Sequence, residues 1–198
     1  MPIVHSETTR APTRYYDRIF IPRATVISAW EFLRSNGARG HEQLCFLAGR
    51  VVGDGDSPSA QVTSCVFPLT VSSPGYVTLT SHCQTAVVLD ALELRHEVPL
   101  MSLHTHGDGG AWGCGPQHSS VDDHGVALTP ENGVFSGILP YYAQGSPFDF
   151  VRQLSLYERV EGKWERLSDS SKERRLVVHD DVVRIVSAPP DGRGGPIG

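Results

Sequence analysis

An apolar run that ends in two histidines is the feature that most constrains the fold of this sequence. Residues 100–106 (LMSLHTH) follow Pro99 and precede a glycine-rich stretch. Side chains at positions i and i+2 of a strand point to the same face. The sequence therefore predicts a strand that carries His104 and His106 side by side at its end.

Helices and further strands are expected around this strand. Ile27, Trp30 and Leu33 recur at helical spacing between Pro22 and Gly37, which predicts a first helix. The other expected elements are a helix at residues 81–96 headed by a capping box, a short helix at 119–128, strands at 42–52, 61–67, 76–79, 133–142 and 154–160, and a final hairpin or edge pair at 163–167 and 176–186.

The order of these elements favours an α+β fold. Because strands and helices are mixed without strict βαβ alternation, we expect a mixed, mostly antiparallel curved sheet flanked by helices. A chain of 198 residues with 39% hydrophobic residues is long enough for one compact domain. We expect that domain to span residues 1–187, since residues 188–198 (APPDGRGGPIG) are rich in Pro and Gly and predict a disordered tail.

Composition and charge argue against several classes of partner. The formal net charge is −5 and no basic stripe is present, so nucleic acid is not an expected partner. No leader opens the chain, and no apolar run approaches the roughly 20 residues needed to span a bilayer. The cysteines form no CxxC pair, which predicts free thiols in a reducing, cytoplasmic compartment, at Cys45, Cys65, Cys83 and Cys114.

The two histidines and a later aspartate offer the ligands of a metal site. Imidazole nitrogens and a carboxylate oxygen are ligands that a catalytic zinc prefers, at about 2.0–2.2 Å, with a fourth position left for water. His104, His106 and Asp122 form such a set. Each part also has a plain structural interpretation: an HxH pair is often simple packing, and Ser119 with Asp122 fits a helix capping box.

Residues near this set offer alternatives to it. His118, Asp123 and His124 are close enough in sequence to act as ligands, although solvated side chains are expected at these positions. Cys114 is expected to be a bystander thiol. The glycine-rich loop at residues 107–118 is expected to be either a lid over an extended substrate or a plain surface loop.

Together these motifs resemble the signature of the JAB/MPN+ (JAMM) zinc metalloproteases. Residues 42–49 (EQLCFLAG) resemble the family's E-x-x-G-x-L-x-G strand, and His104-x-His106 with Ser119-x-x-Asp122 resembles the rest. The resemblance covers roughly residues 20–160 and implies an MPN/cytidine-deaminase-like sandwich. It is nearest to short bacterial JAB proteins encoded with E1-like, E2-like and ubiquitin-like partners, some in antiphage operons.

Three departures from the family pattern bear on the site. Cys45 stands where the family has glycine, Gly107 stands where it has proline, and the loop between the histidine pair and Ser119 is longer than is common. This loop leaves a second register open, because Ser120 and Asp123 satisfy the same pattern one residue later. Residues 119–122 (SSVD) resemble the Ser-small-Val-Asp form that is frequent in the family, which favours the first register.

The resemblance implies hydrolysis of a peptide or isopeptide bond. Zinc would polarise the scissile carbonyl and lower the pKa of a water to about 7. Glu42 would move the proton of that water to the departing amine, and Ser119 would donate a hydrogen bond to the negative oxygen that develops. A solvated Glu42 that simply ends a loop is the plain alternative.

The implied substrate is a ubiquitin-like protein, cleaved after its C-terminus during deconjugation or precursor processing. Two other hypotheses stay open. One is a zinc hydrolase of another amide, such as a small metabolite or a sulfur-carrier peptide. The other is a non-catalytic MPN scaffold.

Overall fold

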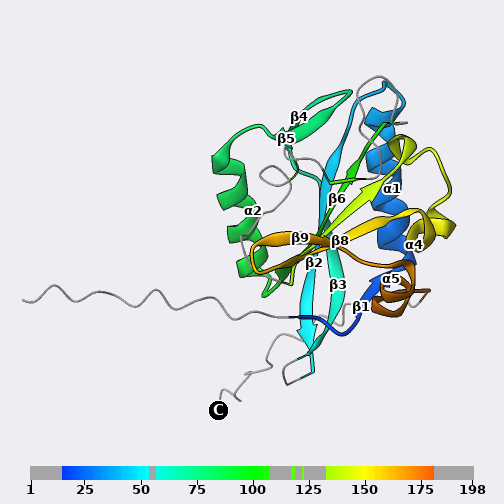
Figure 1. Cartoon of the computed structure of the whole chain (residues 1–198). Coiled ribbons are helices and arrows are strands. Elements are labelled where there is room, and N and C mark those ends of the chain that lie inside the picture. The colour runs from blue at the N-terminus through cyan, green and yellow to red at the C-terminus, as the bar shows by residue number, and fades with distance from the viewer. Residues whose placement is uncertain (1–14, 54–56, 108–116, 119–121, 123–132, 181–198) are drawn as a thin grey trace, which may run out of the picture.

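A curved eight-stranded sheet forms the centre of the structure, a computed structural model that describes residues 15–53, 57–107, 117–118, 122 and 133–180 (Figure 1). In spatial order its strands are β10 (Leu176–His179), β1 (Ile19–Pro22), β3 (Ser59–Val66), β2 (Leu44–Val52), β6 (Val98–Thr105), β7 (Phe135–Leu139), β8 (Ser155–Val160) and β9 (Lys163–Arg166). β1 runs parallel to both neighbours and β6 runs parallel to β7, whereas the other neighbouring pairs are antiparallel. The chain therefore has the α+β fold, with a mixed and mostly antiparallel sheet, that the sequence predicts.

Helices cover both faces of this sheet (Figure 1). They are α1 (Arg23–Gly37), α2 (His82–Leu94), α4 (Phe150–Gln153) and α5 (Asp169–Arg175), with 3₁₀ turns η1 (Tyr141–Ala143) and η2 (Pro147–Asp149). Leu33 of α1 belongs to the same core cluster as Leu47 of β2, while Val88 of α2 packs against the cluster that contains Phe46. Because successive side chains of β2 alternate between the two layers, this strand is a nearly continuous apolar run.

A small second sheet lies beside the entrance to β2. It consists of β4 (Thr70–Ser73) and β5 (Tyr76–Leu79), which pair antiparallel. The backbone N–H of Glu42 donates to the carbonyl of Ser73 at 3.0 Å. The side chain of Gln43 accepts a hydrogen bond from the hydroxyl of Thr70 at 2.7 Å. These contacts fix the two residues that precede β2.

The position of Pro99 corrects one expectation. From the sequence Pro99 was expected to precede the histidine strand, but it lies inside β6, which begins at Val98. The register between β2 and β6 shifts between Leu47 and Ala48, where Ala48 is the neighbour of Pro99. A proline lacks a backbone N–H and is tolerated inside a sheet at such an irregularity.

The last two strands correct another expectation. Residues 163–167 and 176–186 do not form a hairpin, because β9 and β10 lie at opposite edges of the sheet and α5 comes between them in the chain. The four-residue strands β1 and β4 and the short helix α5 were not predicted. The helix expected at residues 119–128 lies outside the described residues except for Asp122, and the tail expected at residues 188–198 lies outside them entirely.

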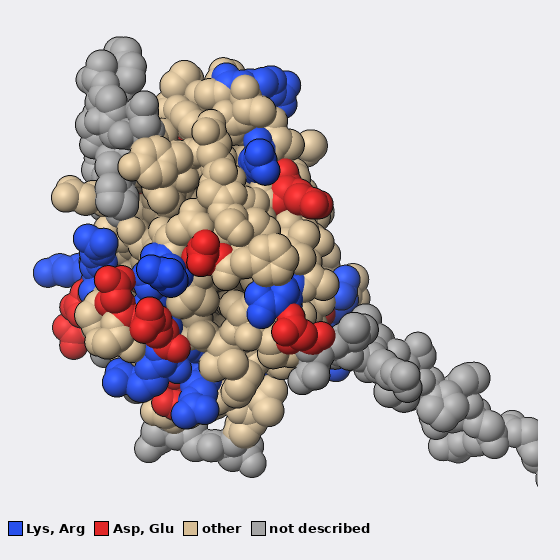
Figure 2. All heavy atoms as spheres, turned by 90° about the vertical axis from the view of Figure 1, so that its right-hand side faces the viewer, with Lys and Arg blue, Asp and Glu red and all other residues tan. Residues whose placement is uncertain are grey.

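The side of the molecule on which α1, α4 and α5 lie carries charges of both signs (Figure 1, Figure 2). Figure 2 shows this side, where Lys and Arg lie next to Asp and Glu over the lower part of the view. No helix in the described part of the chain is long and apolar enough to cross a membrane.

We predict that Gly49→Ala destabilises the sheet. A Cβ at Gly49 would lie 2.0 Å from the carbonyl oxygen of Gln61 on β3. Because that atom belongs to the backbone, the strands themselves would have to shift, and overpacking of this kind typically costs about 1–3 kcal/mol. Chemical denaturation of the purified proteins measures the change.

Gly75→Ala is the matched control. A Cβ at Gly75 meets no atom within 4 Å, so its free energy of unfolding should stay within a few tenths of a kcal/mol of the parent value. Equal stability of the two variants would show that the β2–β3 contact is looser than described.

Candidate metal centre

The two histidines lie at the end of β6, close to the middle of the sheet. His104 is paired with Leu44 of β2 on one side and with Ile138 of β7 on the other. His106 follows the last residue of β6, and its backbone N–H donates to the carbonyl of Leu139 at 3.0 Å. Both side chains are buried, and their Nε2 atoms lie 3.2 Å apart, so the histidines converge as the sequence predicts.

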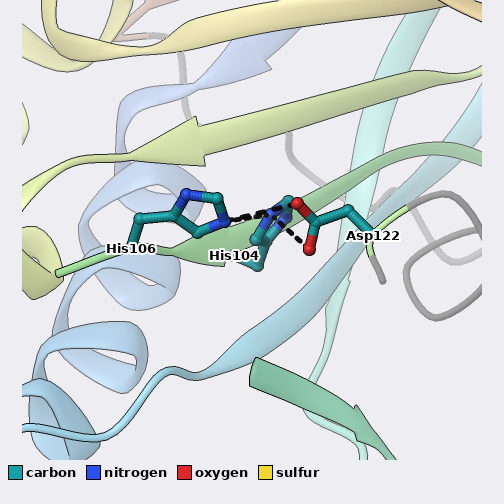
Figure 3. A group of neighbouring side chains, drawn as sticks. All are labelled: His104, His106 and Asp122. Atoms are coloured by element: carbon teal, nitrogen blue, oxygen red, sulfur yellow. Dashed lines mark hydrogen bonds and ion pairs between the residues drawn. The ribbon is translucent and has the colours of Figure 1, made fainter. Parts of the chain in front are cut away.

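Asp122 brings its carboxylate to both imidazoles. Its Oδ1 lies 3.5 Å from Nε2 of His104, and its Oδ2 lies 3.4 Å from Nε2 of His106. Figure 3 shows the three side chains pointing toward one another. The carboxylate is buried as well. The three residues therefore form a compact group whose ligand atoms all lie within 4.8 Å of one another.

The distances in this group fit a tetrahedral metal site. A tetrahedron with bonds of about 2.0–2.2 Å has edges of about 3.3–3.6 Å. The two Nε2 atoms lie 3.2 Å apart, and Asp122 presents a different oxygen to each of them, at 3.5 Å from His104 and 3.4 Å from His106, so each separation is close to such an edge. One ion could therefore contact both nitrogens and a carboxylate oxygen of Asp122, which leaves a fourth position for water or substrate.

The protonation state of His104 suits a metal ligand. Burial lowers its pKa, and a neutral imidazole is the form that binds metal. Its other ring nitrogen, Nδ1, is buried and has no hydrogen-bond partner within the described residues. Metal-binding histidines usually donate this N–H to an oxygen. The orientation of His104 is therefore set mainly by packing between its two neighbouring strands.

Glu42 enters the site from the chain segment before β2. The next residue, Gln43, holds this segment beside β6, because its backbone N–H donates to Thr105 Oγ1 at 3.0 Å and its carbonyl accepts from the Thr105 N–H at 3.1 Å. The Glu42 side chain is only 1% exposed. The plain alternative, a solvated glutamate at the end of a loop, is therefore wrong.

The carboxyl group of Glu42 is electrostatically coupled to the metal-binding group. Burial raises its pKa from 4.5 to about 7, His106 opposes this rise, and Asp122 adds to it. Its Oε1 atom is buried and has no hydrogen-bond partner in the part of the chain that the structure describes. An unpartnered carboxyl oxygen beside a metal-binding group is well placed to receive a proton from a water or a substrate.

A left-handed turn after β7 supports the position of His106. Tyr141, Tyr142 and Ala143 have φ angles of 53°, 51° and 56°, a conformation that costs roughly 1–2 kcal/mol per residue. The backbone N–H of Tyr142 donates to the His106 carbonyl at 2.8 Å, and its hydroxyl donates to the Pro74 carbonyl at 3.2 Å. The strained turn thus joins the end of β6 to the β4–β5 turn.

Four of the predicted site residues come together in one buried region, namely His104, His106, Asp122 and Glu42. The remaining predicted residues and alternatives lie outside the described residues, and their roles stay predictions: Ser119, Ser120, Asp123, His124 and Cys114.

His118 differs from the solvated side chain that was expected. Its ring contacts those of Tyr157 and Trp164, with centroid distances of 5.1 and 5.0 Å. Its Nε2 atom lies 3.2 Å from Ser136 Oγ. It is not part of the three-residue metal-binding group. Sequence reasoning missed these contacts because they depend on how β7, β8 and β9 pair.

Comparisons with known proteins establish the fold but not a family. No family model matches the chain, and no curated protein matches it. The structure is similar to the solution structure of a protein from Desulfitobacterium hafniense, with a TM-score of 0.52 and 14% sequence identity over 83% of this chain and 95% of that chain. At this identity the similarity shows a shared fold alone.

We predict that the protein binds one equivalent of a divalent metal through this group. Replacing His106 with Ala should weaken binding by at least about 100-fold, because loss of a direct ligand should cost no less than the 10–100-fold typical of an outer partner. Competition with a chromogenic chelator, using Zn²⁺ as the probe, measures the affinity.

His41→Ala is the control for this measurement. His41 is exposed and next to Glu42 in sequence, so its loss removes an imidazole without removing a ligand. The parent affinity should be retained in this variant. Equal weakening by both substitutions would place the bound metal elsewhere.

Proposed function

We propose that the protein is a zinc-dependent peptidase or isopeptidase of the JAMM type. The observation that carries the proposal is the buried carboxyl group of Glu42 beside the His104, His106 and Asp122 group. Two imidazoles and one carboxylate in a tetrahedral arrangement with an open fourth position are typical of catalytic zinc. A purely structural zinc site would use all four positions for protein ligands.

The proposed reaction divides the work between the metal and Glu42. When bound, zinc supplies Lewis acidity to the scissile carbonyl and to the attacking water. Glu42 takes the proton of the water and passes it to the departing amine, a task that suits a carboxyl group with a pKa near neutrality. A nearby metal ion lowers this pKa, since positive charge favours the carboxylate. Glu42 is then ionised and ready to act as a base at pH 7.

Ser119 has the remaining role in the proposal. Its hydroxyl would donate a hydrogen bond to the negative oxygen that develops on the carbonyl. The residue lies outside the described part of the chain, three positions before the ligand Asp122. The role therefore rests on the Ser-x-x-Asp motif.

The proposed substrate is a ubiquitin-like protein, cleaved after its C-terminus. This part of the proposal rests on the resemblance of residues 42–49, the histidine pair and the Ser-x-x-Asp motif to the JAMM signature. On the same resemblance we propose that the protein has E1-like and E2-like partners and belongs to a bacterial antiphage conjugation system.

We predict that Glu42→Gln separates metal binding from turnover. The amide keeps the shape of the side chain but cannot accept and return a proton, so the rate of hydrolysis should fall by about 10²–10⁴. Elemental analysis should still find one zinc per chain. Glu93→Gln, on the exposed side of α2, is the control and should retain full activity. Unchanged turnover by the Glu42 variant would sink the catalytic role.

Cleavage of a ubiquitin-like protein extended at its C-terminus tests the substrate. We expect cleavage directly after the ubiquitin-like C-terminus, and mass spectrometry of the products identifies the cleaved bond. A zinc chelator should abolish the cleavage. If the protein hydrolyses only small amides, and does so in a chelator-sensitive way, the proposed ubiquitin-like substrate is wrong but the proposed metal-dependent hydrolysis stands. A protein that binds no zinc would support the scaffold hypothesis instead.

A further inference from the structure

A cavity lies on the sheet near the metal centre. Its volume is about 740 Å³. It is lined mainly by the β8–β9 hairpin at one edge of the sheet and by the two described residues that precede Asp122. The lining residues are Gln117, His118, Tyr157, Arg159, Gly162, Lys163, Trp164 and Arg166.

Strand alternation explains why basic and aromatic side chains meet in this cavity. Tyr157 and Arg159 are two residues apart on β8, so they share a face. Their direct partners on β9 are Arg166, opposite Tyr157, and Trp164, opposite Arg159. The hairpin therefore presents two aromatic rings and two guanidinium groups together, and Lys163 adds a third cation near the turn.

The described lining of the cavity is positively charged. It contains Arg159, Lys163 and Arg166 and no carboxylate. The guanidinium group of Arg159 lies over the ring of Trp164, 5.5 Å from its centroid. Both Arg159 Nε and Trp164 Nε1 are buried without a hydrogen-bond partner among the described residues. The cavity thus offers positive charge and aromatic surface to an anion.

His118 connects this cavity to the metal centre. Its ring contacts those of Tyr157 and Trp164 at tilted angles, and its centroid lies 6.2 Å from that of the His104 ring in an edge-to-face arrangement. The register supports the connection, because Ser136 is paired with both Ser102 of β6 and Tyr157 of β8. His104 is two residues after Ser102, so the metal centre and the cavity share one face of the sheet.

We propose that this cavity is an anion-binding subsite that takes a carboxylate side chain of the peptide substrate whose scissile bond lies at the metal centre. The inference deepens the proposed function and rests on it, because that function supplies the peptide substrate. β6 and β8 are two strand spacings apart, or about 10 Å. An extended peptide covers about 3.3 Å per residue, so the acidic residue lies about three positions from the scissile bond.

A carboxylate fits the cavity better than a nucleic acid does. The cations here occupy one hairpin, whereas a nucleic-acid surface needs a basic stripe along the phosphate backbone. The chain as a whole is acidic, with a net charge of −5. Three cations gathered in one cavity of such a chain point to a localised anion beside an apolar ring, which an Asp or Glu side chain within a peptide provides.

Peptide binding tests the subsite without requiring catalysis. The probes are rhodamine-labelled Glu-Glu-Glu-Glu and Gln-Gln-Gln-Gln peptides with capped ends, titrated with metal-free and zinc-loaded protein and followed by fluorescence anisotropy. The Glu peptide should bind at least tenfold more tightly to both forms. Its affinity should fall as salt rises, because the contact is ionic.

The variant Lys163→Gln/Arg166→Gln identifies the location. Both side chains are exposed, so the fold should be retained, and the affinity for the Glu peptide should fall by about tenfold, as expected for the loss of two ionic contacts near the surface. Arg18→Gln/Arg34→Gln removes the same charge from β1's N-terminal flank and from α1 and should leave the affinity unchanged.

Three outcomes would overturn the assignment. They are equal affinity for the two peptides, equal weakening by the two double variants, and displacement of the Glu peptide by an equimolar amount of inorganic phosphate, which would assign the cavity to phosphate. The readout is peptide binding to protein with or without metal. A failure of the hydrolysis experiment, which tests the proposed function, is therefore distinguishable from a failure of this binding experiment.

Discussion

The pairing of β2 with β6 is the constraint on which the site depends. These strands lie inside the sheet, and the register that pairs Leu44 with His104 also places the segment before β2 beside the end of β6. The bonds between Gln43 and Thr105 hold that segment in place. A slip of one residue would turn the histidine to the other face of the sheet. Glu42 and the two histidines are thus positioned relative to one another by hydrogen bonds of neighbouring strands, which hold a site more precisely than a loop does.

The polar side chains at this point create an electrostatic problem that a cation resolves. Glu42, Asp122 and the two histidines are all buried, and an ionised carboxylate in such surroundings is costly unless it is paired. The raised pKa of Glu42 is one expression of that cost. A divalent ion held by this group would stabilise the carboxylate of Asp122 directly and that of Glu42 through space. Metal binding would therefore be coupled to folding stability.

How much the sequence could predict depended on whether a feature is local. The strand that bears the histidines and the helix around Trp30 were predictable because their periodicity lies within one segment. β1 and β4, with four residues each, are too short to show periodicity. The tolerance of Pro99 depends on the register of a partner strand, and the contacts of His118 depend on how three strands pair. The approach of Asp122 to the histidines could be predicted only from the Ser-x-x-Asp motif, because Asp122 lies far from them in the sequence.

The proposed anion subsite belongs to a protein that is acidic overall. This combination of a local positive charge with a negative net charge determines which step of peptide binding the subsite affects. Beyond a Debye length of about 8–10 Å charges are largely screened, and the net charge of −5 does not attract an acidic peptide, so the cations do not steer it from a distance. Arg159, Lys163 and Arg166 would act on a carboxylate only within the cavity that they line. Selectivity would therefore appear in the rate of dissociation rather than in the rate of association. On the proposed function, a peptide with an acidic residue at the right distance from the scissile bond would stay bound for longer than one with the same charge elsewhere.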